Sequence, residues 1–221
     1  PTKAGRFLPF SSLTPTIYMT ALPDTPRAPL ELDPMGERVR ATWTAGDFGR
    51  IAKGYSRGSA EFIARLGFER LEPVLDLACG TGNLAIPAAR TGASVTGIDI
   101  APNLVSQAQT RALAEGLSIR FDVGDAEQLP YANGEFQTVV TMFGAMFAAR
   151  PERSAAEMLR VTRSGGRIAM ANWTPAGFIG EMLRMTTKYV APPTGISSPL
   201  LWGTEDAVRA RLGSGVKSLT L

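Results

Sequence analysis

The sequence contains no histidine among its 221 residues and only one cysteine. The lack of histidine removes Ser–His–Asp triads, histidine general bases and histidine metal ligands, so we expect no metal site in this chain. The one cysteine, Cys79, cannot form an internal disulfide, and low cysteine usage is typical of a reducing compartment. We therefore expect a cytoplasmic protein.

Long apolar runs and dense basic runs are missing as well. A membrane-spanning helix needs about 20 consecutive apolar residues, and no stretch of this sequence reaches that length. The net charge of +3, from 23 basic and 20 acidic residues, is spread along the chain, so nucleic-acid binding is not favoured. The length and a hydrophobic content of 44% fit one α/β domain with a sizeable core.

The chain divides into a lead-in and a single domain. Residues 1–34 contain Pro1, Pro9, Pro15, Pro23, Pro26, Pro29 and Pro34. No helical or strand period survives that proline density, so we predict a flexible lead-in over residues 1–34 and one domain over residues 35–221. Apolar periodicity over residues 47–66 predicts two helices or one bent helix, since Gly54 and Gly58 weaken its middle.

The remaining pattern alternates strands with helices, which predicts a doubly wound, mostly parallel sheet with helices on both faces. The predicted strands cover residues 73–77, 94–99, 118–123, 136–142 and 167–171. A turn at residues 164–166 precedes the fifth strand. Helices are expected over residues 178–190 and from Thr204, as the N-cap, to Leu212. Residues 216–221 look like the start of a sixth strand, which suggests a truncated domain.

The most informative stretch is VLDLACGTGNLA, residues 74–85. It reads as a buried strand, a glycine turn and the start of a helix. Gly80 and Gly82 allow a sharp turn and a close approach of the backbone to a ligand. Such a turn directs free N–H groups at whatever lies above it, which is typical of a nucleotide-type site at the carboxyl end of a parallel strand.

Acidic residues mark the ends of three successive strands. Asp99 follows the glycine turn at the interval usual for a ribose-binding carboxylate. Asp125, with the backbone N–H of Ala126, can read an adenine edge. Asp76 lies inside the first strand and favours the cationic end of a ligand. Each has a plainer interpretation: Asp99 and Asp125 can be helix caps, and a lone G-x-G-x-x-A motif is weak. A carboxylate inside an apolar strand, however, needs a partner, so the combination favours a binding site.

These motifs resemble the class I S-adenosylmethionine-dependent methyltransferases, and in particular the ubiquinone/menaquinone-type branch, whose members methylate small molecules. The likeness is carried by DLACGTG at residues 76–82, GIDI at 97–100, GDAEQLP at 124–130 and LRVTRSGG at 159–166. It implies S-adenosylmethionine as the cofactor, with the methionyl part at Gly80 and Gly82. The cofactor-binding set implied is Asp76, Ala78, Gly80, Gly82, Asp99, Ile100, Asp125 and Ala126.

Two departures from the family pattern are visible. The fourth strand opens with Phe136-Gln137 where the family often has Phe-Asp, a position that we interpret as structural. The family's sheet usually has seven strands, and the last one has no counterpart here. We expect the acceptor pocket over the ends of the first and fourth strands. Its predicted walls are Tyr55, Phe143, Met146, Phe147 and Trp173, although the same residues can be plain core.

The sequence therefore predicts transfer of a methyl group from S-adenosylmethionine to a small-molecule acceptor. The base, if one is needed, is an Asp, Glu, Tyr or Lys that the sequence does not identify. Cys79 has no base close in sequence and is interpreted as a packing residue. Two alternatives stay open: a cofactor-binding module without turnover, and an NAD(P)-dependent oxidoreductase, which would share the glycine turn but gives no role to Asp76 or Asp125.

Overall fold

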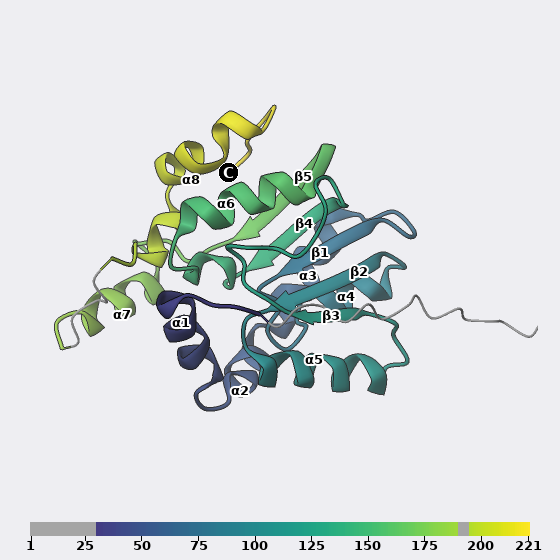
Figure 1. The fold of residues 1–221 in the computed structure, drawn as a ribbon, viewed down its shortest axis with the longest axis horizontal. Helices are drawn as coiled ribbons and strands as arrows, with labels where there is room; N and C mark the ends of the chain where they lie inside the picture. Colours follow the sequence, from purple (N-terminus) through teal and green to yellow (C-terminus); the bar gives the residue numbers. More distant parts are fainter. Residues whose placement is uncertain (1–29, 190–194) are drawn as a thin grey trace, which may run out of the picture.

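The sheet has five parallel strands in the order β3-β2-β1-β4-β5. The computed structural model describes residues 30–189 and 195–221, so most of the predicted lead-in lies outside the described residues. The strands are β1 (Pro73–Leu77), β2 (Ser94–Asp99), β3 (Arg120–Val123), β4 (Phe136–Met142) and β5 (Thr162–Ala171). Helices lie on both sides of this sheet (Figure 1). The predicted doubly wound α/β fold is confirmed.

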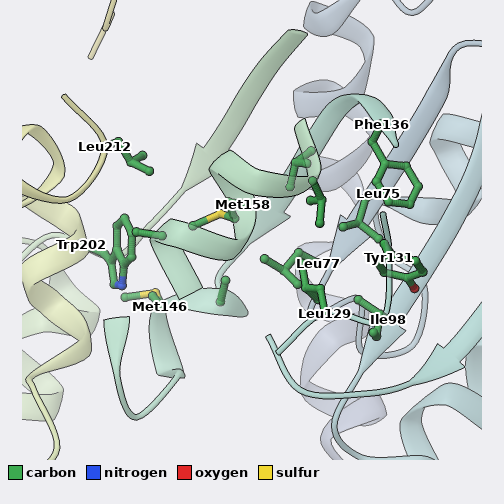
Figure 2. Packing of buried hydrophobic residues seen from close by; sticks show 14 of the residues in the cluster. Leu75, Leu77, Ile98, Leu129, Tyr131, Phe136, Met146, Met158, Trp202 and Leu212 are labelled. Carbon is green, nitrogen blue, oxygen red and sulfur yellow. The ribbon is translucent and has the colours of Figure 1, made fainter. Parts of the chain in front are cut away.

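Each face of the sheet is buried under its own apolar cluster. Side chains alternate between faces along a strand, so Leu75 and Leu77 point to one side while Val74 points to the other. The first side is covered by α6 (Pro151–Val161) and α8 (Glu205–Leu212), together with Trp202, and Figure 2 shows this packing. The second side is covered by α3 (Ser56–Leu66) and α4 (Ala85–Arg90). Within the described residues, no helix has the length and apolarity needed to cross a bilayer.

The segment before β1 forms a helical layer that reaches the carboxyl ends of the strands. It consists of α1 (Pro34–Thr44), α2 (Phe48–Ala52), a 3₁₀ turn (Lys53–Tyr55) and α3. The prediction of two helices over residues 47–66 is confirmed by α2 and α3. Helix α1 was not predicted. The Asp33 carboxylate accepts the amides of Met35 and Gly36, and Pro34 occupies the first turn, so Pro34 belongs to a helix and not to the lead-in.

Near β5 one sequence prediction is wrong, and at α8 the predicted N-cap is confirmed in position but not in its hydrogen bond. The predicted turn at residues 164–166 is a bulge inside β5, because Phe136 pairs with Thr162 while Thr138 pairs with Arg167. Strand β5 therefore begins at Thr162 and not at Arg167. Thr204 does occupy the N-cap position of α8, but its hydroxyl donates to the carbonyl of Leu201 and caps no helix amide.

The end of the chain also differs from the prediction. Residues 216–221 form no strand, and Leu219 packs against the apolar cluster beneath α6 and α8. A strand needs a neighbour that supplies ladder hydrogen bonds, and none is paired with this segment. Helix α7 (Phe178–Thr186) ends earlier than expected, and Val190 lies outside the described residues. Between β2 and β3 lies α5 (Pro102–Ala114), with Gly116 in the left-handed region just beyond it.

A buried carboxylate ties the sheet together at the end opposite the glycine turn. Glu72, which is 8% exposed, accepts hydrogen bonds from the Thr138 hydroxyl at 2.6 Å and from Arg167 at 3.2 Å. Arg167 also donates to the carbonyl of Leu66 at 2.6 Å. The Arg167 guanidinium therefore connects β5, β4, the residue before β1 and the end of α3. Hydrogen bonds from Thr138 and Arg167 help hold the pKa of Glu72 below its usual value.

We expect Arg167→Met to lower the free energy of unfolding by about 1–3 kcal/mol, because it leaves a buried carboxylate with fewer donors. Urea unfolding followed by circular dichroism measures the change. Arg163→Met is the matched control, since Arg163 lies on the same strand, is exposed and donates to the side chain of Gln137. An equal loss in both variants would contradict this role of Arg167.

Candidate functional site

A cavity lies at the carboxyl ends of the strands, where the strand order reverses between β1 and β4. In open α/β sheets this crevice is the usual ligand site. The cavity has a volume of about 170 Å³. Residues of α1 and α2 cover it, among them Gly36, Trp43 and Phe48. Seven of the predicted cofactor residues line the cavity: Asp76, Ala78, Gly80, Asp99, Ile100, Asp125 and Ala126.

The glycine turn has the close-approach geometry that the sequence predicts. Gly80 has a φ of +52°, and a Cβ built on it finds no atom within 4 Å, so the space above it is free for a ligand. Gly82, with a φ of +81°, does not line the cavity. A Cβ there would lie 3.3 Å from Ile86 and 3.4 Å from Ala108. Gly82 therefore permits the turn and the close packing of α4 against α5.

Asp99 stabilises the backbone of the glycine turn with the same carboxylate that is predicted to bind the ribose. One carboxylate oxygen accepts the amide of Gly80 at 2.8 Å, and the other accepts the amide of Ala101 at 2.9 Å, just before α5. The side chain is 7% exposed, and burial raises its pKa. Each carboxylate oxygen has a second lone pair, so a diol can still bind to Asp99. The helix-cap and ligand interpretations are therefore compatible.

Asp76 is the most deeply buried acid of the site. It is 1% exposed, and one of its oxygens accepts the amide of Ala85 at 2.8 Å, at the start of α4. Burial, together with the nearby Asp99 carboxylate, raises the pKa of Asp76 to about 8 against the opposing effect of the Ala85 hydrogen bond. A cation bound in the cavity would lower this pKa again, so the site is electrostatically ready for a positively charged ligand group.

Asp125 belongs to a network that fixes α1 over the cavity. Its carboxylate accepts the amide of Glu127 at 2.9 Å, and burial raises its pKa. Glu127 forms an ion pair with Arg150, which also pairs with Asp33 at the start of α1. The hydrogen bond from Arg150 lowers the pKa of Asp33 to about 2. A Cβ on Gly36 would lie 3.6 Å from Asp125, so this helix approaches the predicted adenine position closely.

Aromatic rings form the other part of the cavity wall. Phe143 stacks on Trp173 with centroids 3.6 Å apart, and Tyr55 lies 5.7 Å from both rings. These three residues and Phe147 line the cavity as predicted. Met146 does not: it is 1% exposed and packs in the core with Met158 and Trp202, as Figure 2 shows. A 3₁₀ turn (Ala145–Phe147) directs the two neighbouring side chains to different surroundings, which sequence alone does not reveal.

The sequence analysis missed the contribution of α1 and α2. Trp43 lies 5.0 Å from Phe147 and 5.1 Å from Phe48, measured between ring centroids, and all three line the cavity. The capping signal Asp33-Pro34, followed by a helical stretch, was available in the sequence. It was outweighed by the proline density of the residues before it.

The ends of β1 and β4 meet closely below this wall. Ala78 and Phe143 both have a φ of +56°, an uncommon conformation for residues with a side chain. A Cβ on Gly144 would lie 2.6 Å from the carbonyl oxygen of Ala78, so glycine is required there. Strained backbone of this kind gathers at ligand sites. Cys79 beside Ala78 is buried, and burial raises the pKa of its thiol, which agrees with its predicted packing role.

The charge of the lining indicates which ligands fit. Among the described residues, the lining contains the carboxylates of Asp76, Asp99, Asp125 and Glu127 and no lysine or arginine. Phosphate groups would be repelled by this set, whereas an ammonium or sulfonium group would be attracted. The open space at Gly80 and the acids at three strand ends fit an adenosyl sulfonium.

Comparison with known proteins agrees with this chemistry. Residues 74–166 match a family described as a methyltransferase domain. An uncharacterised protein of Mycobacterium tuberculosis is 42% identical over 171 residues, which are 76% of this chain and 62% of the relative. A demethylmenaquinone methyltransferase of Deinococcus radiodurans is 37% identical over 126 residues, which are 55% of this chain and 52% of that protein. The chain thus spans less than two thirds of the length of these relatives.

The fold comparison includes a structure with a bound ligand. Magnesium protoporphyrin IX methyltransferase from Synechocystis PCC 6803, crystallised with SAH, matches with a TM-score of 0.60 at 24% identity. The match covers 81% of this chain and 88% of that one, and it shows that the two share a fold.

The burial of Asp76 gives a pH prediction. Its pKa rises from the ordinary 3.8 to about 8 on folding, so the folded protein binds more protons than the unfolded chain between these values. The free energy of unfolding therefore falls as pH rises through this window. Asp76→Asn removes that contribution and should flatten the fall, while Asp99 and Asp125 leave a residual slope. Urea unfolding from about pH 5 to pH 8 tests this. The exposed Asp206→Asn is the control, and an unchanged slope in Asp76→Asn would refute the assignment.

Proposed function

This chain belongs to the class I S-adenosylmethionine-dependent methyltransferases, and on that premise we propose that it transfers a methyl group from S-adenosylmethionine to a small, apolar, planar acceptor. The observation that carries the proposal is the division of one cavity into two chemically different parts. Carboxylates from the ends of three parallel strands line one part, and aromatic rings from the helical layer and the end of β4 line the other.

The acidic part would hold the cofactor. Asp99 would accept hydrogen bonds from the ribose diol with its remaining lone pairs, and Asp125 with the amide of Ala126 would bind the adenine edge. Asp76 and the backbone above Gly80 would bind the methionyl end, where the positive charge lies. Ala78 and Ile100 line the cavity between these groups and supply close backbone surface.

The aromatic part would hold the acceptor. When bound, S-adenosylmethionine supplies the electrophilic methyl group, so the chain needs no nucleophile of its own. The task of the protein is to align the acceptor with that methyl group and to exclude water. Tyr55, Phe143 and Trp173 offer flat apolar surfaces for a planar ring, and Trp43 with Phe147 would close the cavity above it. Tyr55 supplies the phenolic hydroxyl of this aromatic set.

The acceptor class is supported by a relative. The Deinococcus radiodurans protein is named as a demethylmenaquinone methyltransferase, and its name points to a hydroxylated aromatic ring as its acceptor. An acceptor of that type, a quinol or a phenol, fits an aromatic-walled cavity.

The two alternatives from the sequence receive less support. A nicotinamide dinucleotide would bring a pyrophosphate next to several carboxylates with no arginine or lysine in the described lining. A module that binds the cofactor without turnover is compatible with a chain that spans 62% of its mycobacterial relative. Turnover assays decide between this module and an active enzyme.

Calorimetric titration of the chain with S-adenosylhomocysteine and, separately, with NADH tests the cofactor. Binding of S-adenosylhomocysteine alone is expected, and binding of NADH alone would overturn the proposal. Turnover is measured with S-adenosylmethionine carrying a tritiated methyl group and panels of quinols and phenols. Binding without transfer to any acceptor, in this chain and in a longer one from the same gene, would favour the binding module.

We expect Asp99→Ala to weaken binding of S-adenosylhomocysteine by about 1.5–3 kcal/mol, the range for losing hydrogen bonds to a charged group. Isothermal titration calorimetry on folded protein gives the value. Asp206→Ala, at an exposed position of α8, serves as the control and should bind like the wild type. Wild-type affinity in Asp99→Ala would leave Asp99 as a structural residue only.

A further inference from the structure

We propose that Arg111 on α5 is a positioning residue that holds the glycine turn in its binding conformation and, through Asn83, couples that turn to the helical layer over the acceptor. This inference rests on the proposed function, because the turn is taken as the cofactor site. Arg111 itself does not line the cavity and touches no ligand position. Its effect would be exerted entirely through the residues that it contacts.

The turn from Ala78 to Ala85 is held at three places. Asp99 accepts the amide of Gly80, and Asp76 accepts the amide of Ala85. Both of these carboxylates line the cavity. The third contact comes from Arg111, which lies outside the cavity lining and binds Thr81 and Asn83, two residues that belong to it.

Arg111 makes this third tie with one guanidinium nitrogen, Nη1. It donates to the carbonyl oxygen of Thr81 at 2.5 Å, to the Thr81 hydroxyl at 3.1 Å and to Oδ1 of Asn83 at 2.9 Å. Thr81 is 4% exposed, so its carbonyl has little access to water. Hydrogen bonds from a charged donor to such groups are stronger than neutral ones. Residues 81–83 are therefore fixed relative to α5.

Asn83 connects Arg111 to the helical layer through two hydrogen bonds of its side-chain amide. While its Oδ1 accepts from Arg111, its Nδ2 donates to the carbonyl of Ala52 at 2.7 Å. Ala52 is the last residue of α2, and the 3₁₀ turn that follows ends at Tyr55 in the aromatic wall. One amide side chain thus links the cofactor turn to the segment that carries Phe48 and Tyr55.

Close packing reinforces this link. A Cβ on Gly49, in α2, would lie 2.3 Å from the Gln107 side chain of α5 and 3.3 Å from the methyl group of Thr81. Helix α2 therefore packs against the Gln107 side chain of α5 and against the Thr81 methyl group of the glycine turn. A shift of the turn would change both this contact and the Asn83 hydrogen bond to α2.

Two variants test the positioning role by different readouts. In Arg111→Met we expect the dissociation constant for S-adenosylhomocysteine to rise about tenfold, a change of about 1.4 kcal/mol. In Asn83→Ala, which keeps the Arg111–Thr81 hydrogen bonds, we expect a smaller rise. Amide hydrogen exchange of a peptide covering residues 48–55 gives the second readout. S-adenosylhomocysteine should slow this exchange in the wild type and fail to slow it in both variants, a difference that a loss of stability alone does not produce.

Arg90→Met is the matched control, since Arg90 forms a surface ion pair with Glu115 and lies outside the cavity lining of the described residues. It should bind S-adenosylhomocysteine like the wild type. Arg111→Lys retains the charge and is used if Arg111→Met does not fold, with an intermediate affinity expected. The proposal is overturned if the folded Arg111 and Asn83 variants bind within about twofold of the wild type and keep the slowed exchange. A wild type that binds no S-adenosylhomocysteine would instead refute the proposed function.

Discussion

The site depends on two buried carboxylates that accept backbone amides from the segment between β1 and α4. Sharp turns at strand ends leave N–H groups without partners, and a buried amide without a partner is costly. Asp99 satisfies the amide of Gly80, and Asp76 satisfies that of Ala85. Both acids are almost completely buried, and burial raises the pKa of each. The same two groups therefore stabilise the turn and line the cavity, where a bound cation would favour their charged forms.

The helical layer before β1 supplies what the sheet cannot. The strand ends provide acids and a free backbone, whereas Trp43 and Phe48 provide apolar surface over the same cavity. Arg150 fixes one end of this layer, because it forms ion pairs with Asp33 at the start of α1 and with Glu127. At its other end, Asn83 joins α2 to the glycine turn. Ion pairs and a side-chain amide thus attach the helices that carry the apolar residues to the strand ends that carry the acids.

Membership of the methyltransferase family and the identity of the acceptor rest on different parts of the chain. The family match covers residues 74–166, which contain the glycine turn and the acidic strand ends. The aromatic wall draws on Trp43, Phe48 and Tyr55, which precede that region, and on Trp173, which follows it. A fold hosts many activities, and the acceptor is selected by the site built onto it. The acidic part of the cavity therefore lies within the family match, whereas the aromatic part draws on residues both inside and outside it.

The sequence by itself determined the parallel sheet, the positions of most of its strands and the acids at the strand ends. These features depend on short-range patterns: apolar runs, glycines at a turn and acids directly after strands, whose carboxyl ends meet at one edge of the sheet. The tertiary structure alone decided that Phe147 faces the cavity while Met146 enters the core, that α1 covers the site, and that residues 216–221 form no strand. Each of these depends on contacts between segments far apart in the chain, such as Arg150 with Asp33, for which local periodicity carries no signal.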